Sequence, residues 1–436
     1  MVFPQESLVY DVRLSSVGPG RVSGSNVFHN LSGLDLAMKL HYLKIVYFFE
    51  SEPAQGLTTP KVKESLFYLL NHYFILCGRF RRLESGRPII KCNDCGVRFI
   101  EAKCKITLDE WLATKDWPSY KLLVSQQVIG PELSFSPPVL MQITHFKCGG
   151  ASMGLSWAHV LGDPLSASDF INTWGQAMVN LQLNKPINVP RLPFELNESI
   201  FENDIVCVKR VDSVGDHWIP PNNRKIDTFS FQVTNSQINY LQTNIGGQSF
   251  DRTPPFESLC AVIWQCVARI KEGFEPNIVT VCKTNPHRLG NEMMSNNQII
   301  KRVEVGKRSI VDTHVRVLAS LLANQGIDER NEIEKLVDKD EGVTDFFVYG
   351  ANLTFVDLEE INMYDLQLMG HKPRFVYWTL QGVGDEGVVL VMPWKNSSIN
   401  NGNDGKFVTI ILPEEQMVKL KIELKNNGLV LEGDLE

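Results

Sequence analysis

The sequence predicts an α/β protein built from two lobes. Apolar residues at helical spacing alternate with short apolar runs typical of strands in both halves of the 436-residue chain. A segment between the halves, residues 184–221, contains five prolines and no sustained periodicity, which is typical of a connector. A chain of this length also fits two domains of about 100–200 residues each. We therefore expect an N-terminal lobe over residues 1–184, a crossover linker over 185–225 and a C-terminal lobe over 226–436.

In the first half, four segments have a clear pattern. Leu40–Phe49 is rich in aromatic and aliphatic residues, as a buried strand would be, and Val62–Cys77 has the apolar spacing of a helix. Val139–Phe146 and Ala151–Ala158 are apolar runs on either side of a glycine turn, which predicts a hairpin. A helical apolar stripe begins at Ala167. The first half therefore alternates strands with helices.

The second half repeats this alternation. The predicted strands are Phe229–Val233, Ile278–Val281, Val388–Met392 and Phe407–Leu412, and the predicted helices are Phe256–Ile270, Ile310–Leu322 and Glu414–Leu424.

The composition excludes several classes of protein. Hydrophobic residues make up 43% of the chain and charged residues 21%, which excludes a disordered or collagen-like chain. The formal charge of −7 and the lack of a long basic run argue against a nucleic-acid-binding surface. No stretch has the ~18–20 apolar residues that a membrane-spanning helix needs, and residues 1–17 are unlike a secretory signal. We therefore expect a cytoplasmic protein, a monomer, without a transmembrane segment.

The nine cysteines are scattered, as expected for reduced thiols in a protein that is not secreted. Cys92 and Cys95 have the spacing of a zinc or redox pair, but no second pair of ligands follows at a suitable distance. We therefore expect no metal.

One short motif points to chemistry. His159 follows the second strand of the predicted hairpin, and Asp163 lies four residues further on. An imidazole held at the end of a strand could take the proton from a hydroxyl or amine as that group attacks a thioester carbonyl. Asp163 could orient the ring or brace the loop. The alternative is a hydrogen-bonded core histidine and a turn-capping aspartate, and the spacing alone does not separate the two.

Two other catalytic interpretations are weaker. Gly154–Ala158 resembles the nucleophile elbow G-x-S-x-G, but Ser156 lies inside a predicted strand rather than at a strand-to-helix turn. His159 and Asp163 also lack an evident third ligand for a metal.

Several runs of the chain resemble, in order, motifs of the plant BAHD acyltransferases, which transfer acyl groups from coenzyme A thioesters. The runs are Leu31–Asp35 (L-S-x-L-D), Tyr73–Arg79 (Y-x-P-L-A-G-R), Cys92–Ala102 (a strand ending F-x-E-A), His159–Asp163 (HxxxD) and Phe256–Leu259 followed by Trp264 (F-E-x-L-x-A-x-x-W).

The resemblance implies the fold of that family: two chloramphenicol-acetyltransferase-like lobes, each a mixed sheet flanked by helices, joined by a crossover loop. It implies acyl-CoA as substrate or ligand, with no bound cofactor and no metal. It also implies a channel between the lobes in which His159 is the general base, if the protein is active, and Asp163 a structural or orienting residue.

The chain also departs from the family pattern. Gln367–His371 stands where active members have the D-F-G-W-G loop that supports the channel, and Pro164 replaces the glycine that usually follows HxxxD. Val281–Asn285 lacks the pair of an acidic and a basic residue that family members usually have after the corresponding strand. In the family an arginine there braces the aspartate of HxxxD, so Arg288 is left as a candidate partner for Asp163. These departures point to a sub-branch of the family.

Five further runs resemble the wax-related Eceriferum and Glossy clade of BAHD-like proteins: Leu34–Tyr42, Phe146–Gly150, Ser156–Asp163, Tyr349–Phe355 and Gly382–Leu390. The resemblance implies a role in extending very-long-chain fatty acyl-CoA for cuticular wax, with the β-ketoacyl-CoA synthase of the elongase as partner. It implies a location at the cytosolic face of the endoplasmic reticulum. It also implies that the HxxxD motif, His159–Asp163, does not carry out the protein's activity. The alternative is an active acyl-CoA:alcohol or amine acyltransferase with His159 as general base.

Overall fold

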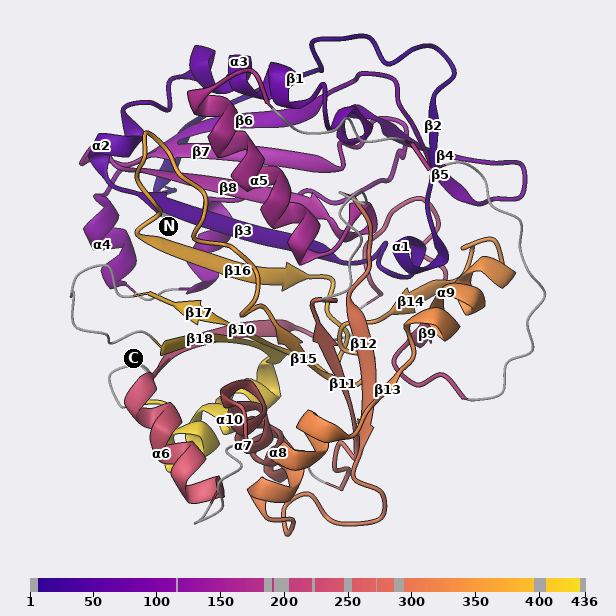
Figure 1. Ribbon diagram of the computed structural model, residues 1–436, viewed down its shortest axis with the longest axis vertical. Helices are drawn as coiled ribbons and strands as arrows, with labels where there is room; N and C mark the ends of the chain where they lie inside the picture. Colours follow the sequence, from indigo (N-terminus) through magenta and orange to yellow (C-terminus); the bar gives the residue numbers. More distant parts are fainter. Residues whose placement is uncertain are drawn as a thin grey trace, which may run out of the picture.

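The computed structural model describes residues 7–114, 117–183, 190–191, 204–221, 224–246, 253–271, 273–285, 294–395 and 405–431. Two lobes lie one above the other in Figure 1, each built around a mixed β-sheet with helices packed against it. The predicted two-lobe α/β fold is therefore confirmed.

The first lobe contains a six-stranded sheet in the order β1-β6-β7-β8-β3-β16. Only β6 and β7 pair in parallel, and every other neighbouring pair is antiparallel. The strands are β1 (Val9–Val17), β6 (Val97–Cys104), β7 (Val139–His145), β8 (Ala151–Ala158), β3 (Tyr42–Phe49) and β16 (Phe375–Gln381). A small sheet of β2 (Phe28–Asn30), β5 (Pro88–Lys91) and β4 (Arg79–Arg82) lies beside it.

The second lobe contains a seven-stranded sheet in the order β10-β18-β17-β15-β11-β12-β13. Its central strands β11, β15 and β17 pair in parallel, and the remaining pairs are antiparallel. The strands are β10 (Ile226–Thr234), β18 (Gly405–Pro413), β17 (Val388–Trp394), β15 (Leu353–Asp357), β11 (Ile278–Lys283), β12 (Ile299–Glu304) and β13 (Ile327–Asp328). A two-stranded ribbon joins β9 (Lys209–Val211) to β14 (Asp345–Phe347).

Helices cover the outer faces of the two sheets (Figure 1). The helices of the first lobe are α1 (Gly33–Ala37), α2 (Ser51–Ala54), α3 (Thr59–Leu69), α4 (Leu108–Ala113) and α5 (Pro164–Val179), with short 3₁₀ turns η1 (Phe74–Cys77), η2 (Trp117–Leu122) and η3 (His159–Leu161). Those of the second half are α6 (Asn235–Gly246), α7 (Pro255–Ile270), α8 (Val315–Asn324), α9 (Arg330–Lys339) and α10 (Glu414–Asn426). Helices α6, α7, α8 and α10 lie against the second sheet, whereas α9 packs against α1.

One strand crosses from the second half of the chain into the first lobe. β16 pairs along its whole length with β3, from Phe375 opposite Phe48 to Gln381 opposite Tyr42. The strands before and after it in the chain, β15 and β17, belong to the second sheet. Apolar periodicity does not reveal this crossing, because it reports whether a strand is buried and not which sheet it joins. Much of the predicted linker, 185–225, lies outside the described residues.

Most predicted elements appear within a few residues of their expected bounds. Two helices are shorter than expected. The run Val62–Cys77 ends as a helix at Leu69 and resumes only as the 3₁₀ turn η1, and the helix expected from Ile310 begins at Val315. Apolar spacing continues through both turns, so the spacing alone does not show where a helix ends.

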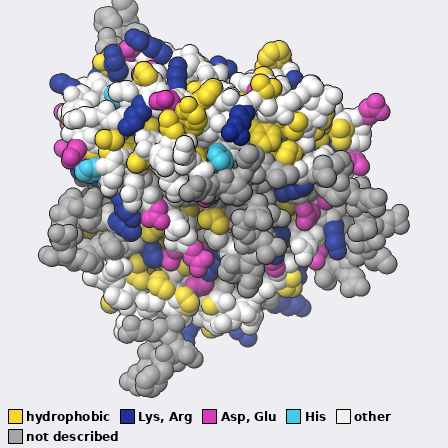
Figure 2. All heavy atoms as spheres, turned by 45° about the horizontal axis from the view of Figure 1, so that its top comes forward, with side chains coloured by type: hydrophobic (Ala, Val, Ile, Leu, Met, Phe, Trp, Pro, Cys, Tyr) yellow, Lys and Arg dark blue, Asp and Glu magenta, His cyan; other side chains and the backbone are white. Residues whose placement is uncertain are grey.

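The surface carries mixed charge. On the face drawn in Figure 2, the described Lys and Arg side chains are interspersed with Asp and Glu and with hydrophobic side chains. Among the described residues, no helix is long and apolar enough to cross a lipid bilayer.

Candidate functional site

His159 begins the short turn that follows β8. Its side chain is fully buried, with no exposed surface. Its backbone is held from two sides, because its amide donates to the His41 carbonyl at 3.0 Å and its carbonyl accepts from the Asn296 amide at 2.8 Å. The end of a central strand therefore fixes this residue between segments from both halves of the chain.

The ring of His159 contacts Tyr349. The His159 Nε2 atom lies 3.0 Å from the Tyr349 hydroxyl, which donates in turn to the Gln298 side-chain oxygen at 3.1 Å. Since the hydroxyl has one proton and gives it to Gln298, we infer that the Nε2 atom carries the proton of the imidazole and donates to Tyr349. The other ring nitrogen, Nδ1, has no hydrogen-bond partner among the residues that the structure describes.

Burial also sets the charge of this ring. It lowers the pKa of His159 from 6.5 to about 4, against the opposing attraction of Asp163. It raises the pKa of the Tyr349 hydroxyl well above its ordinary value near 10. Both groups are therefore neutral at pH 7.

A second buried histidine supports the first. His41 Nδ1 lies 2.8 Å from the Gly382 carbonyl oxygen, so it is the protonated nitrogen, and Nε2 accepts from the Val348 amide at 3.1 Å. The His41 ring lies edge-on to Tyr349, with ring centres 4.9 Å apart. Burial lowers the pKa of His41 to about 3. His41 thus fixes the backbone that presents Tyr349 to His159.

Asp163 caps helix α5. Its carboxylate accepts from the Ser166 amide at 3.0 Å and from the Asn297 amide at 3.2 Å. Pro164 occupies the first turn of the helix, where its missing N–H is not needed. Gly162 has φ +152°, and a Cβ atom there would lie 2.6 Å from Ser166 Oγ. Asp163 therefore holds the loop and the start of α5, and its carboxylate makes no hydrogen bond to the His159 ring. Arg288, the partner considered for Asp163 from the sequence, lies outside the described residues.

The run Leu31–Asp35 contributes to the same region. Ser32 and Asp35 form a capping box at the start of α1, and Asp35 also accepts from the Asn296 side chain at 3.1 Å. Because the same Asn296 amide donates to the His159 carbonyl, this early motif helps to hold the candidate site.

The loop that replaces D-F-G-W-G packs on the first lobe. A Cβ atom on Gly175 of α5 would lie 2.7 Å from Leu366 and 2.9 Å from the Gln367 carbonyl oxygen, so the loop approaches the helix closely. His371 is exposed, and its ring lies 3.7 Å from the Glu52 carboxylate. This loop therefore adds no described catalytic side chain beside His159.

The other sequence-based alternatives find no support in the geometry. Ser156 lies within β8 and accepts from the Lys44 ammonium at 2.7 Å, so it is not at a nucleophile elbow. Cys92 is buried and Cys95 is exposed, and both are free thiols. Within the described part of the chain, no three His, Cys, Asp or Glu side chains are grouped to hold a metal ion.

Sequence reasoning missed Tyr349 and Asn296, which are hydrogen-bonded to His159, and Gln298, which holds the Tyr349 hydroxyl. Two of the runs that resemble the wax-related clade contain Tyr349 and His41. That signal could have drawn attention to both residues, but neither spacing nor composition brings positions 41, 159 and 349 together.

Comparison with known proteins identifies the relatives of this chain. Protein ECERIFERUM 26-like from Arabidopsis thaliana is 40% identical over 425 residues, which cover 97% of this chain and 96% of the relative. Protein ECERIFERUM 2 from the same plant is 37% identical over 435 residues, covering 96% of this chain and 99% of the relative.

Solved structures share the fold at low sequence identity. Vinorine synthase superposes with a TM-score of 0.68 at 20% identity, over 96% of this chain and 98% of that one. F. sporotrichioides TRI101 complexed with coenzyme A and T-2 gives a TM-score of 0.69 at 14% identity, over 91% of this chain and 97% of that chain. The model of the Transferase family matches residues 17–426. The family predicted from the sequence is confirmed: this chain belongs to the Transferase family, the BAHD acyltransferases, with ECERIFERUM proteins among its relatives.

Proposed function

We propose that this protein binds long-chain acyl-CoA and promotes the elongation of very-long-chain fatty acyl groups for cuticular wax. It does so as a partner of the condensing enzyme, a β-ketoacyl-CoA synthase, at the cytosolic face of the endoplasmic reticulum. In this proposal His159 and Asp163 are structural, and no acyl group is transferred through His159.

The contact between His159 and Tyr349 is the observation that carries this proposal. A general base needs a free nitrogen within hydrogen-bond reach of the acceptor hydroxyl. Here Nε2 is hydrogen-bonded to Tyr349 rather than to a substrate, and the whole ring is buried. A ring with a pKa of about 4 is also a weak base at neutral pH.

The binding of acyl-CoA is supported by the family and the fold. The BAHD resemblance implies acyl-CoA as substrate or ligand, and one structure with the same fold, at 14% identity, is complexed with coenzyme A. A buried acyl chain contributes about 0.8 kcal/mol per CH₂ group, so a long chain can be held without any covalent step. Preferential binding of one chain length would shift the products of an elongase toward that length.

The second candidate is a working acyltransferase with His159 as general base. The intact His159 and Asp163, together with the Nδ1 atom that lacks a described partner, favour it. In that case a thioester and an acceptor would have to reach Nδ1.

A thiol-release assay separates the two functions. Purified protein is incubated with a long-chain acyl-CoA and a series of alcohols and amines, and acyl-CoA binding is measured in parallel by calorimetry. We expect binding without thiol release above background, and equal binding by wild type and His159→Gln. Thiol release that depends on His159 would establish the transferase, and absence of binding would overturn both candidates.

A further inference from the structure

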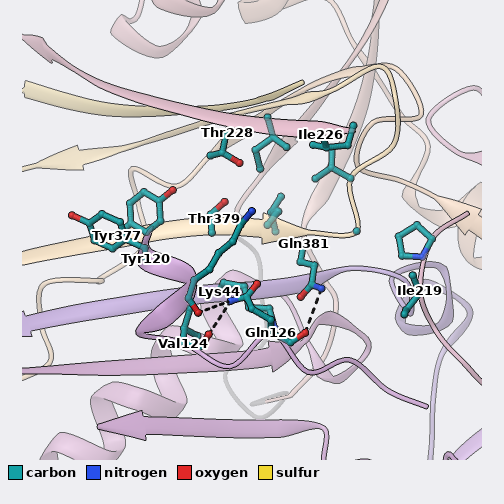
Figure 3. Close-up of a pocket in the computed structure, with 16 residues that line it drawn as sticks. Lys44, Tyr120, Val124, Gln126, Ile219, Ile226, Thr228, Tyr377, Thr379 and Gln381 are labelled. Atoms are coloured by element: carbon teal, nitrogen blue, oxygen red, sulfur yellow. Dashed lines mark hydrogen bonds between the residues drawn. The ribbon is translucent and has the colours of Figure 1, made fainter. Parts of the chain in front are cut away.

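A cavity of about 460 Å³ lies between the two lobes, away from His159. Figure 3 shows that its walls come from both: Ile226 and Thr228 of β10 lie opposite Thr379 and Gln381 of β16. The volume falls within the ~300–1,000 Å³ typical of small-molecule sites. His159 is not among the residues that line it.

The lining has positive charge and no counter-charge. Among the described residues that line the cavity there are two lysines, Lys44 and Lys121, and no Asp or Glu. Lys121 is exposed, whereas Lys44 retains 1% of its surface. A low-dielectric wall strengthens the field of an ammonium, so such a cavity favours an anion.

Lys44 is an unusual residue for its position. It stands in the middle of β3, whose other side chains are aliphatic or aromatic. Its ammonium donates to the Ser125 carbonyl and to Ser156 Oγ, both at 2.7 Å, and the structure shows no carboxylate bonded to it among the described residues. Burial lowers the pKa of Lys44 to about 7, because the cost of removing the charge from water is not offset by a neighbouring anion.

The rest of the lining is amphipathic. Ile219, Ile226 and Ile411 supply apolar wall, and Thr228 and Thr379 supply hydroxyl groups. The Gln381 amide nitrogen makes a long contact of 3.5 Å with the Gln126 carbonyl, drawn in Figure 3, so it can turn toward a ligand at little cost.

We propose that this cavity is a binding site for an amphipathic carboxylate, a free fatty acid whose head group is attracted by Lys44 and Lys121 and whose chain contacts the apolar wall. The site is independent of the acyl-CoA binding proposed above and requires nothing of His159. It adjoins the His41 network, because Gly382 lines the cavity and its carbonyl accepts from His41 at 2.8 Å.

The test uses ligands of one chain length and different charge. Calorimetric or fluorescence titration of the full-length protein compares dodecanoate, 1-dodecanol and dodecyltrimethylammonium. We expect dodecanoate to bind at least tenfold more tightly than the alcohol, and the cation to bind most weakly. Equal affinities for all three, or no binding of dodecanoate, would overturn the proposal.

Variants then locate the site. Lys44→Met keeps the length of the side chain without its charge, and should reduce dodecanoate affinity about tenfold while leaving the affinity for dodecanol unchanged. Lys121→Met, at an exposed position, should have a smaller effect. Thr228→Phe, at a half-buried position, should block both ligands, and it tests the site even if Lys44→Met does not fold. Unchanged dodecanoate binding in Thr228→Phe would place the ligand elsewhere.

Coenzyme A without an acyl chain serves as the control for the ligand class. We expect it not to displace dodecanoate. Displacement by coenzyme A would assign the cavity to the thioester ligand and overturn the fatty acid site, whereas loss of acyl-CoA binding alone would contradict only the proposed function.

Discussion

The Tyr349 hydroxyl fills the hydrogen-bonding position of His159 Nε2, which leaves Nδ1 as the ring nitrogen without a described partner. The hydroxyl is held from its other side by Gln298, and His41 fixes the backbone of Tyr349. The sequence therefore keeps the His159–Asp163 motif, but the His159 ring is hydrogen-bonded to another residue of the protein. The side chains of Tyr349, Gln298 and His41, which come from distant parts of the chain, are buried and neutral and hold the His159 ring in this hydrogen bond.

The tautomer of His159 follows from this chain of hydrogen bonds. We expect nitrogen NMR of ¹⁵N-histidine-labelled protein to show the Nε2–H form at pH 7, since the Tyr349 proton is given to Gln298. The signal is assigned by its loss in His159→Gln, and Tyr349→Phe should shift it. An Nδ1–H tautomer would contradict the arrangement and restore Nε2 as the available base.

Asp163 is expected to act as a helix cap. Asp163→Ala should lower the free energy of unfolding by about 1–2 kcal/mol, because the Ser166 and Asn297 amides lose their acceptor. Asp163→Asn retains a capping oxygen and should lose much less. Urea unfolding compares the two variants, and equal destabilisation would show that the charge of Asp163, rather than its capping bond, is what matters.

At the scale of elements, β16 joins the two lobes most directly. It is the edge strand of the first sheet, yet it lies in the chain between two strands of the second. Its Trp378 side chain is 1% exposed and belongs to a core cluster that also contains Leu390 and Phe407 of the second sheet. The two lobes should therefore unfold together.

Truncation of Trp378 tests this coupling. Trp378→Ala should lower stability by about 3–5 kcal/mol, as large aromatic truncations in a core do, and should shift a single unfolding transition. Val418→Ala on α10, where the side chain is 65% exposed, is the control and should change stability by less than about 0.5 kcal/mol. Two separate transitions in far-UV circular dichroism would contradict the coupling.

The sequence predicted the elements better than their assembly. Apolar periodicity located β3, β7, β8 and α5, because burial on one or both faces determines that pattern. It could not place β16 beside β3, since pairing partners far apart in the chain leave no local signal. The same limit applies at the site: the motif identified His159 and Asp163, but the Tyr349 contact depends on a fold that joins positions 190 residues apart.

At the scale of the whole molecule, three buried histidines make stability depend on pH. The pKa values of His29 and His159 are lowered to about 4 and that of His41 to about 3, mainly by burial. The unfolded chain therefore binds more protons than the folded chain below pH 6.5. The stability of the folded protein is therefore not reduced by these histidines above pH 6.5, and it falls as the pH is lowered toward 4 and below.

Removing one of these histidines should flatten that dependence. Each group contributes up to about 1.4 kcal/mol per pH unit between the two pKa values. His159→Gln should therefore lose less stability than wild type between pH 6.5 and 4.5, whatever its stability at pH 7. Urea unfolding at several pH values gives both slopes, and equal slopes would show that His159 is not held neutral by burial.

The central claim is that this chain promotes elongation without chemistry at His159. The most direct measurement is the acyl-chain profile of cells that co-express a very-long-chain condensing enzyme with wild type or His159→Ala, each at a matched protein level. We predict equal lengthening of the acyl chains by both proteins. Lengthening by wild type alone would contradict the claim and favour the transferase, and lengthening by neither would contradict the role in elongation itself.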